Sequence, residues 1–227
     1  MRVVSLVPFS TETLIELGAE VIACTRFCEQ PNLLHVGGTK NPDVAAIVSL
    51  AVDLVVMDRE ENRREDYDTL VAAGCNVFAS DVRSIAEALD VVEELAVLSG
   101  VRPSAAVPTP SPRVGESRTA FMPIWRRPWM TIGTQTYGGS MLEHLGIDLV
   151  TAGSSKSYPT VELDDIAALA PQLVLVPSEP YEFTDEHVAE LRDRFTQARI
   201  VRVDGKDLFW WGARTAGAIT RLAEAIS

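Results

Sequence analysis

The chain has 227 residues, of which 47% are hydrophobic and 23% charged, values typical of a globular protein with a packed core. Its net charge of −12 and its pI near 4.7 argue against nucleic acid or an anionic membrane as its main partner. It has no apolar run of about 18 residues, and Met1-Arg2 leads directly into "VVSLVP", which predicts a strand rather than a signal peptide. As given, we expect it in the cytoplasm, or in the periplasm or at the cell surface only if a signal was removed.

Strand and helix patterns alternate along the first half of the chain, which predicts parallel sheets with helices on their faces. Strands are predicted at 3–8, 20–27, 53–58 and 76–80. Helices are predicted at 11–18, 41–50, 64–74 and 84–100. Ser10 is the predicted N-cap of the first helix, with Glu12 in its first turn and Gly18 at its end.

The pattern breaks at 99–118, a stretch with four prolines that predicts a connection rather than a helix. After it, "IAALAPQLVLVPSE" from Ile166 aligns without a gap with "IVSLAVDLVVMDRE" from Ile47. This indicates a duplicated α/β lobe. We predict an N-terminal lobe at 1–98, whose helix at about 84–98 runs between the lobes, and a C-terminal lobe at 119–227. Ligands of such sheets bind beyond the carboxyl ends of the strands, here in a cleft between the lobes.

The segment "FMPIWRRPWMTIG", residues 121–133, holds two of the four tryptophans. We interpret it as the first strand of the second lobe with its carboxyl-end loop, which places Trp125 and Trp129 near the cleft. Arg126 and Arg127 would then be available to carboxylates or phosphates. The alternative is that both tryptophans fill the core and both arginines are solvated.

The cysteines and histidines show no metal or catalytic pattern. Cys24 and Cys28 have C-x3-C spacing and no second pair follows, so reduced thiols are expected. Nucleophile-elbow, phosphate-loop and dinucleotide motifs are absent, as are paired histidines. His35 could offer an axial nitrogen to the metal of a bound chelate, or could simply bond to the backbone.

Several stretches resemble the class III, helical-backbone substrate-binding proteins of ABC importers. They are "RVVSLVPFSTETLIELGA", "VGGTKNPDVAAIVSLAVDLVV", in which Val52 replaces a usual proline, and "SYPTVELDDIAALAPQLVLV". "TRFC", "TKNPD", "EENR" and "PIWRRPWMT" are most similar to the cobalamin-binding branch. The resemblance implies two Rossmann-like lobes with parallel sheets, joined by a long helix, and a non-catalytic site for a flat metal chelate such as a corrinoid, a ferric siderophore or haem. No built-in cofactor is implied.

The same resemblance assigns a wall of the site to each lobe. From the first lobe it implies Pro8, Phe9, Phe27 and the neighbourhood of Thr39 and Asp58, with Arg26, Glu61 and Asn62 as polar contacts. From the second lobe it implies Trp129, Tyr158, Trp210 and Trp211, beside Trp125. Arg214 is either a ligand contact or a helix-start residue in an ion pair. Family members carry aromatic residues near Thr39 and Asp58, and this chain does not.

Two departures from the family bear on the partner. The family docks on its importer through one acidic residue of each lobe. Asp164 keeps this residue in the second lobe, but Ala45 occupies the matching position of the first. The interval 99–118 also interrupts the lobe-spanning helix. Together they favour a cytosolic carrier or sensor over an importer component. An enzyme and a protein-interaction module on the same fold remain as alternative hypotheses.

Overall fold

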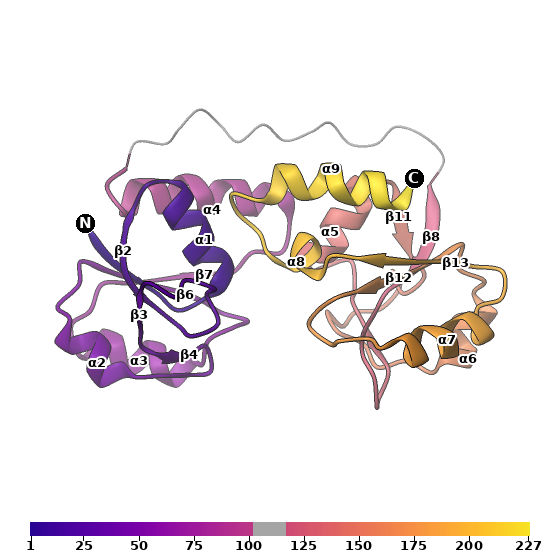
Figure 1. Ribbon diagram of the computed structural model, residues 1–227, viewed down its shortest axis with the longest axis horizontal. Coiled ribbons are helices and arrows are strands. Elements are labelled where there is room, and N and C mark those ends of the chain that lie inside the picture. Colours follow the sequence, from indigo (N-terminus) through magenta and orange to yellow (C-terminus); the bar gives the residue numbers. More distant parts are fainter. Residues whose placement is uncertain (102–116) are drawn as a thin grey trace. The chain divides into compact units, whose positions relative to one another are not determined.

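The computed structural model describes residues 1–101 and 117–227, and these residues form two α/β units. The first unit consists of residues 1–82, 86–101 and 211–213. The second consists of residues 83–85, 117–210 and 214–227. Each unit has its own parallel sheet, so the fold class predicted from the alternating pattern is confirmed (Figure 1). The connection predicted for 99–118 lies, apart from its ends, outside the described residues.

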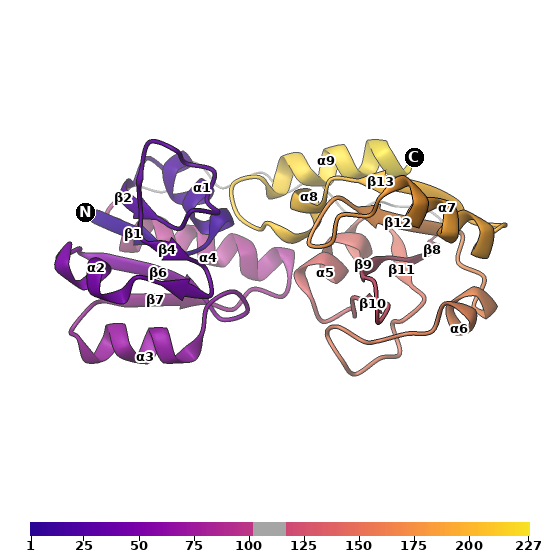
Figure 2. The same ribbon diagram turned by 60° about the horizontal axis from the view of Figure 1, so that its bottom comes forward.

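The first unit has a five-stranded parallel sheet in the order β3-β2-β1-β6-β7. Its strands and helices are β1 (Arg2–Ser5), α1 (Pro8–Glu16), β2 (Glu20–Cys24), β3 (Leu34–His35), the hairpin of β4 (Gly37–Gly38) and β5 (Asn41–Pro42), α2 (Val44–Ser49), β6 (Leu54–Asp58), α3 (Arg64–Ala72), β7 (Val77–Ser80) and α4 (Ile85–Leu98). Helices α2 and α3 cover one face of the sheet, and α1 and α4 cover the other (Figure 2).

Burial on both faces explains the sequence of the central strand β6. All five residues of "LVVMD" are buried, as expected for a parallel strand covered by helices on each side. On the face of α2 and α3, Ile47 and Leu70 pack against Val55 and Met57 of β6. The predicted helices at 64–74 and 84–100 are confirmed with small changes at their ends.

Two predicted helix starts in this unit are wrong. The first helix begins at Pro8, not after Ser10, because proline fits the first helical position and follows β1 after only two residues. Ser10 is therefore buried inside α1, and the N-cap is Val7, which forms no side-chain cap. The second helix begins at Val44, capped by Asp43, because Asn41 and Pro42 form strand β5.

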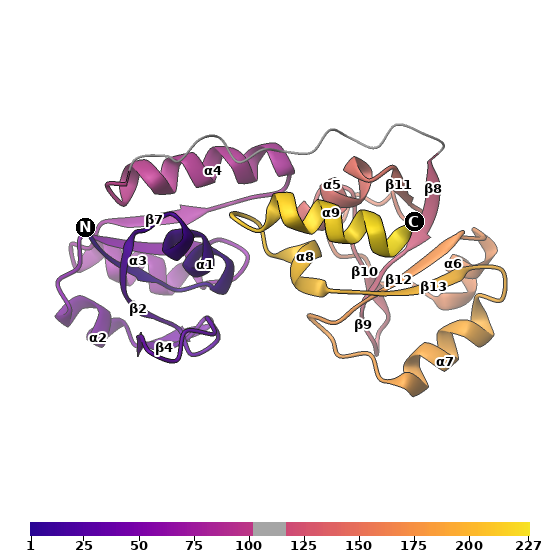
Figure 3. The same ribbon diagram turned by 45° about the horizontal axis from the view of Figure 1, so that its top comes forward.

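The second unit has a four-stranded parallel sheet in the order β11-β8-β12-β13. Its strands and helices are β8 (Arg118–Phe121), β9 (Pro123–Trp125), β10 (Met130–Thr131), α5 (Tyr137–His144), β11 (Ile147–Leu149), α6 (Leu163–Ala168), β12 (Leu173–Pro177), α7 (Asp185–Arg194), β13 (Arg199–Val203), α8 (Gly205–Phe209) and α9 (Thr215–Ile226). Helices α6 and α7 lie on one face of the sheet, and α5, α8 and α9 lie on the other (Figure 3).

The duplicated segments predicted from the sequence occupy equivalent places in the two units. Helix α2 leads into β6 and α6 leads into β12, and both strands are buried throughout. The second residue after each helix is an alanine in the left-handed conformation, Ala51 and Ala170, each with φ of 46°. This conformation is uncommon for a residue with a Cβ, so its recurrence supports the duplication.

The segment 121–133 differs from its prediction. The first strand of the second sheet is β8, which ends at Phe121. Most of the segment instead forms an antiparallel hairpin of β9 and β10 beyond the carboxyl end of β8. None of the helices that the structure describes is both long and apolar enough to cross a membrane.

Candidate functional site

The site residues predicted for the first lobe lie at the carboxyl ends of its parallel strands or in the loops that follow them. Pro8 follows β1, Arg26 and Phe27 follow β2, and Asp58 ends β6. Glu61 and Asn62 lie in the loop after β6. Because these strands are parallel, their carboxyl ends meet at one edge of the sheet. We call this set, with Phe9 and Thr39, the first edge.

Asn62 holds three segments of the first edge together. Its amide nitrogen donates to the carbonyl oxygens of Thr39, at 2.8 Å, and of Leu6, at 3.3 Å. Its amide oxygen accepts from the backbone N–H of Asp58 at 2.9 Å. Both amide hydrogens and the oxygen are therefore used inside the protein, and the residue is buried. The structure makes Asn62 a positioning residue, and Thr39, also buried, contributes its backbone to the same network.

Asp58 organises the loop after β6. One carboxylate oxygen accepts from the backbone N–H groups of Glu60, at 2.9 Å, and Glu61, at 3.3 Å, while the other accepts from the Ser80 hydroxyl at 2.7 Å. Burial raises the pKa of Asp58 to about 6, and these hydrogen bonds only partly oppose it. The buried Asp58 side chain thus fixes the loop that carries Glu61.

Phe27 is the exposed aromatic side chain of the first edge, with 52% of its surface accessible. The Arg26 guanidinium lies over its ring, 4.7 Å from the centroid, within the range of a cation–π contact. Gly38 leaves room for this arginine, because a Cβ at Gly38 would come within 2.8 Å of a guanidinium nitrogen. Arg26 and Phe27 together present a flat apolar face and a cation.

Trp211 is not where the sequence predicts it. It belongs to the first unit, not to the second, and only 3% of its surface is exposed. Its ring packs on Phe9, with ring centroids 4.9 Å apart. The neighbouring Gly212 has φ of +113°, and a Cβ there would collide with the Thr13 hydroxyl. The chain thus crosses between the units after Trp210, and Trp211 and Phe9 belong to the core of the first unit.

A run of four aromatic side chains lies beyond the carboxyl ends of the second sheet. Trp125, at the end of β9, meets Tyr181 edge-on at 5.2 Å. Tyr181 contacts Phe183 at 4.8 Å, and Phe183 stacks on Trp129 with ring centroids 6.0 Å apart. Trp125 is 45% exposed, whereas Phe183 is buried. We call Trp125, Trp129, Tyr181 and Phe183 the aromatic run.

The aromatic run shows that each interpretation of segment 121–133 holds only in part. Trp129 packs partly on the core of the second unit, but Trp125 is exposed. Arg126 is not solvated: its guanidinium nitrogens lie 2.8 and 3.1 Å from one Glu190 oxygen. It also lies over the Trp129 ring at 5.8 Å. Neither interpretation was complete, because the ion pair fixes the arginine beside the aromatic run.

The sequence analysis missed Tyr181 and Phe183. Both follow the buried strand β12, in "VPSEPYEF", at the same kind of strand-end position that singled out Trp125. Tyr158 reaches this region through its backbone. Residues 157–161 run beside 129–133, joined by hydrogen bonds between backbone groups. Tyr158 itself is 39% exposed.

Trp210 follows β13 and α8, and two cations lie near its ring. Lys206 Nζ is 4.7 Å from its ring centroid and the Arg214 guanidinium 5.2 Å. Arg214 precedes α9 and forms an ion pair with Asp207 at 3.3 Å, so it is a helix-start residue in an ion pair and a neighbour of Trp210 at once. We call Trp125, Trp129, Tyr158, Tyr181, Phe183, Lys206, Trp210 and Arg214 the second edge.

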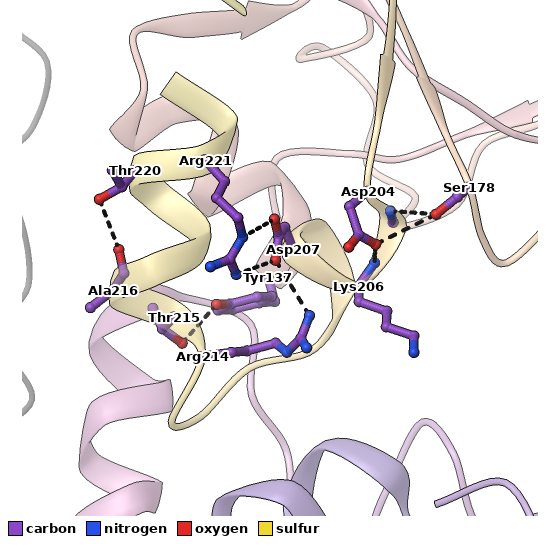
Figure 4. A network of polar contacts seen from close by, with 11 residues as sticks. Tyr137, Ser178, Asp204, Lys206, Asp207, Arg214, Thr215, Ala216, Thr220 and Arg221 are labelled. Atoms are coloured by element: carbon purple, nitrogen blue, oxygen red, sulfur yellow. Dashed lines mark hydrogen bonds and ion pairs between the residues drawn. The ribbon is translucent and has the colours of Figure 1, made fainter. Parts of the chain in front are cut away.

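Asp207 anchors this part of the second edge (Figure 4). Its buried carboxylate also receives two hydrogen bonds from Arg221, at 2.6 and 2.8 Å. Nearby, the Tyr137 and Thr215 hydroxyls are 3.0 Å apart, and burial raises the pKa of Tyr137 to about 12. Helix α9 is thereby joined to α5 through Thr215 and to α8 through Arg221.

The remaining predicted residues lie away from these contacts or are engaged differently. His35 is exposed on β3, and its Nε2 is 3.0 Å from the Gln30 carbonyl oxygen, which makes it the donor nitrogen. Asp164 lies on α6 and forms an ion pair with Arg194, while Ala45 is exposed on α2. Among residues 1–101 and 117–227, no group of three or more His, Cys, Asp or Glu side chains is placed to hold a metal ion.

Comparison with known proteins gives consistent results from sequence and structure. No family model matches the chain. The vitamin B12-binding protein of Salmonella paratyphi A is 24% identical over 197 residues, which is 80% of this chain and 74% of that protein. The periplasmic vitamin B12 binding protein of Vibrio cholerae superposes with a TM-score of 0.78 at 16% identity, covering 99% of this chain and 96% of that one. The periplasmic heme binding protein of Vibrio cholerae gives 0.79 at 17% identity, covering 100% and 98%.

The two parallel-sheet units and these superpositions show that the chain has the class III periplasmic binding protein fold. The resemblance to this family that the sequence indicates is confirmed: the chain shares this fold with vitamin B12-binding and heme-binding proteins and is similar in sequence to a vitamin B12-binding protein. These relatives are named as binding proteins, in agreement with the prediction that the chain is not an enzyme.

Proposed function

We propose that the protein binds a flat metal chelate, a corrinoid or a haem-like ligand, without chemical conversion. The observation that carries the proposal is the aromatic run of the second edge, in which a 45% exposed Trp125 continues a series of contacting rings. Rings of this kind supply a large, rigid apolar surface with little loss of side-chain entropy on binding. The names of the relatives support this choice of ligand.

Each edge, taken by itself, has cations that can supply polar contacts to such a ligand. Arg26 lies over Phe27 in the first unit, and Lys206 and Arg214 lie over Trp210 in the second. Corrinoids carry amides, cobalamin carries a phosphate as well, and haem carries carboxylates, at the periphery of a flat ring. Cations beside aromatic faces can bind such peripheral oxygens while the rings cover the face of the ligand.

A fluorescence titration tests this proposal directly. Purified protein is titrated with cobalamin, cobinamide, haem and a ferric hydroxamate siderophore, and quenching of tryptophan emission is followed. We expect saturable, stoichiometric quenching by one of them, weakened in Trp125→Ala and Trp210→Ala. The matched control is Tyr67→Ala, because Tyr67 on α3 also carries an arginine over its ring, at 5.4 Å, but lies outside both edges.

The outcomes separate the rival functions. If no chelate binds in excess, or if Tyr67→Ala weakens binding as much as Trp125→Ala does, the proposal is wrong. Consumption of a ligand during the titration would indicate an enzyme. Absence of both binding and turnover would favour a protein-interaction module.

The destination of the ligand is a second part of the proposal. An ABC importer permease would dock at acidic residues of both units, and the sequence offers only Asp164. In the first unit, the acid nearest to Ala45 in sequence is Asp43, whose carboxylate accepts the Ala46 N–H at 3.0 Å as a helix cap. We therefore propose a carrier or sensor derived from an importer component, working in the cytoplasm.

Cell fractionation and uptake of labelled chelate test this part. We expect the protein in the cytoplasmic fraction and uptake unchanged by Asp164→Ala. The control is Asp165→Ala, which removes the adjacent exposed acid of the same helix. Loss of uptake in Asp164→Ala alone would show that an importer docks on α6 and would overturn the carrier hypothesis, while leaving ligand binding intact.

A further inference from the structure

Two buried cysteines flank the part of the first edge that carries Arg26 and Phe27. Cys24 is the last residue of β2, and Cys28 closes a turn in which its backbone N–H donates to the Thr25 carbonyl at 3.1 Å. Both thiols are buried, Cys24 completely and Cys28 almost so. Neither forms part of the chelate site proposed above.

The surroundings of Cys28 favour its thiolate. The hydroxyls of Thr11 and Thr25 each lie 3.2 Å from its sulfur. Hydrogen bonding from the Cys24 thiol, and then from these hydroxyls, lowers the pKa of Cys28 against the opposing effect of burial. The same interaction raises the pKa of Cys24. Since a hydroxyl has one hydrogen, Thr11 shares its own among this sulfur, the Val7 carbonyl and the Ser5 hydroxyl, the last two at 2.8 Å.

We propose that Cys24 and Cys28 are a reversible dithiol–disulfide pair that hydrogen peroxide oxidises. The Cys28 thiolate attacks one peroxide oxygen, the O–O bond breaks, and the departing hydroxide takes up a proton as water, leaving a Cys28 sulfenic acid. The Cys24 sulfur then displaces the hydroxyl from this sulfenic acid, which leaves as water with the Cys24 proton. Two thiols and one peroxide give one disulfide and two waters. A thiol reductant reverses the step.

The position of the pair gives oxidation a consequence for the first edge. The turn between the two sulfurs consists of Thr25, Arg26 and Phe27. It is tied to the neighbouring segment at its start, by Val36 N–H to Cys24 O at 2.9 Å, and at its middle, by Arg26 N–H to Gly37 O at 3.0 Å. A bond between the sulfurs closes this turn covalently and removes the thiolate that the threonine hydroxyls surround. This consequence rests on the proposed function, because it concerns residues of the chelate site.

The pair itself is tested without any ligand. Reduced protein is treated with hydrogen peroxide, unfolded, and alkylated, and the remaining thiols are counted by mass spectrometry. We expect the protein to lose two of its three thiols, with a Cys24–Cys28 cross-link in the peptide map, and to regain them with dithiothreitol. The control Cys75→Ser, outside the turn, should lose both of its thiols in the same way.

Single variants identify the order of the steps. We expect Cys24→Ser to stop at a Cys28 sulfenic acid that dimedone traps, and Cys28→Ser to react at least tenfold more slowly. Cys28→Ala, checked for folding by circular dichroism, replaces it if the serine variant does not fold. Loss of Cys75 alone, or cross-links between molecules only, would overturn the proposal.

The effect on binding is measured last, by titrating oxidised and reduced protein with the chelate that binds. We expect oxidation to change the Kd at least threefold in the wild type and not in Cys24→Ser. An unchanged Kd would overturn the link between the disulfide and the first edge. Absence of binding in both forms would refute the chelate proposal, while the thiol counts would still decide whether the pair exists.

Discussion

The two carboxyl edges are built on the same α/β plan but are held in place by different chemistry. In the first unit, Asp58 and Asn62 join strand ends and loops through buried hydrogen bonds, and one aromatic side chain, Phe27, stands exposed. In the second unit, aromatic rings pack on each other, and carboxylates neutralise the arginines beside them. The comparison shows that a duplicated scaffold conserves strands and helices while the loops after the strands change freely.

This difference has an energetic meaning. Buried polar networks are specific in geometry, because each unsatisfied group is costly, so the first edge should be sensitive to single polar changes. Packed rings gain from area and tolerate small shifts. The second edge should instead depend on the few groups that anchor its loops, of which Asp207 is the most buried.

The largest effect is expected from removing that anchor. Asp207→Ala leaves Arg214 and Arg221 without their shared carboxylate, and removing one partner of a buried ion pair costs about 3 to 5 kcal/mol. Because Arg221 is half exposed, we expect the lower end of this range. Urea unfolding followed by tryptophan fluorescence measures it, since three of the four tryptophans lie in the second unit.

The control is Asp204→Ala, which removes the side chain that caps α8 through Lys206 N–H at 2.9 Å. Losing a cap costs about 1 kcal/mol. Equal losses for the two variants would mean that Asp207 acts only as another local helix residue, and the second edge would then have no polar anchor.

The first edge is tested through the pH dependence of stability. The pKa of Asp58 is raised from 3.8 to about 6 in the folded protein, so the folded state holds this proton to higher pH than the unfolded state does. The protonated Asp58 side chain therefore contributes fully to the free energy of unfolding below pH 4, and this contribution is lost as the pH rises through 6. At 1.36 kcal/mol per pKa unit, the loss is on the order of 3 kcal/mol.

Asp58→Asn should remove this dependence and keep the network. The Asn oxygen can accept from the N–H groups of Glu60 and Glu61, and its nitrogen can donate to Ser80, whose hydroxyl then donates to the Met57 carbonyl at 3.1 Å. We expect the variant to be more stable than the wild type at pH 7 and not at pH 4, by circular dichroism in urea. The control is Asp68→Asn on the surface of α3. A parallel pH profile for wild type and Asp58→Asn would contradict the raised pKa of Asp58.

These residues also show what the sequence can and cannot predict. A strand-end position places Trp125 beyond the carboxyl end of a strand, because a parallel strand fixes the side on which its following loop emerges, and the family resemblance adds Asp58 and Phe27. They do not predict that Asn62 bonds to Leu6 and Thr39, since those partners are 56 and 23 residues away. Nor do they separate Trp210 from Trp211: adjacent letters fall in different units because the chain crosses between them there.

A smaller effect, on binding rather than stability, is expected at Phe27. Its exposed ring packs with Arg26 alone among the described aromatic contacts, so Phe27→Ala should change stability by less than about 0.5 kcal/mol, as for surface substitutions. If the ring covers a ligand, the Kd should rise about tenfold, which corresponds to about 1.4 kcal/mol. Titration and thermal melting of Phe27→Ala and of the control Tyr67→Ala give both quantities. A tenfold loss of affinity in the control would remove the first edge from the site.

The smallest effect concerns the ion pair between Arg126 and Glu190. The arginine side chain is 18% exposed and the glutamate 40%, so solvent screens the pair, and partly exposed pairs contribute about 0.2 to 1 kcal/mol. A double-mutant cycle of Arg126→Met and Glu190→Gln should therefore give a coupling energy of about 0.5 kcal/mol, smaller still in 0.5 M salt. Methionine keeps apolar contact with Trp129, so the cycle isolates charge from packing. A coupling energy above about 2 kcal/mol would mean that electrostatics, and not ring packing, holds the aromatic run, and the contrast between the two edges would then be one of charge placement alone.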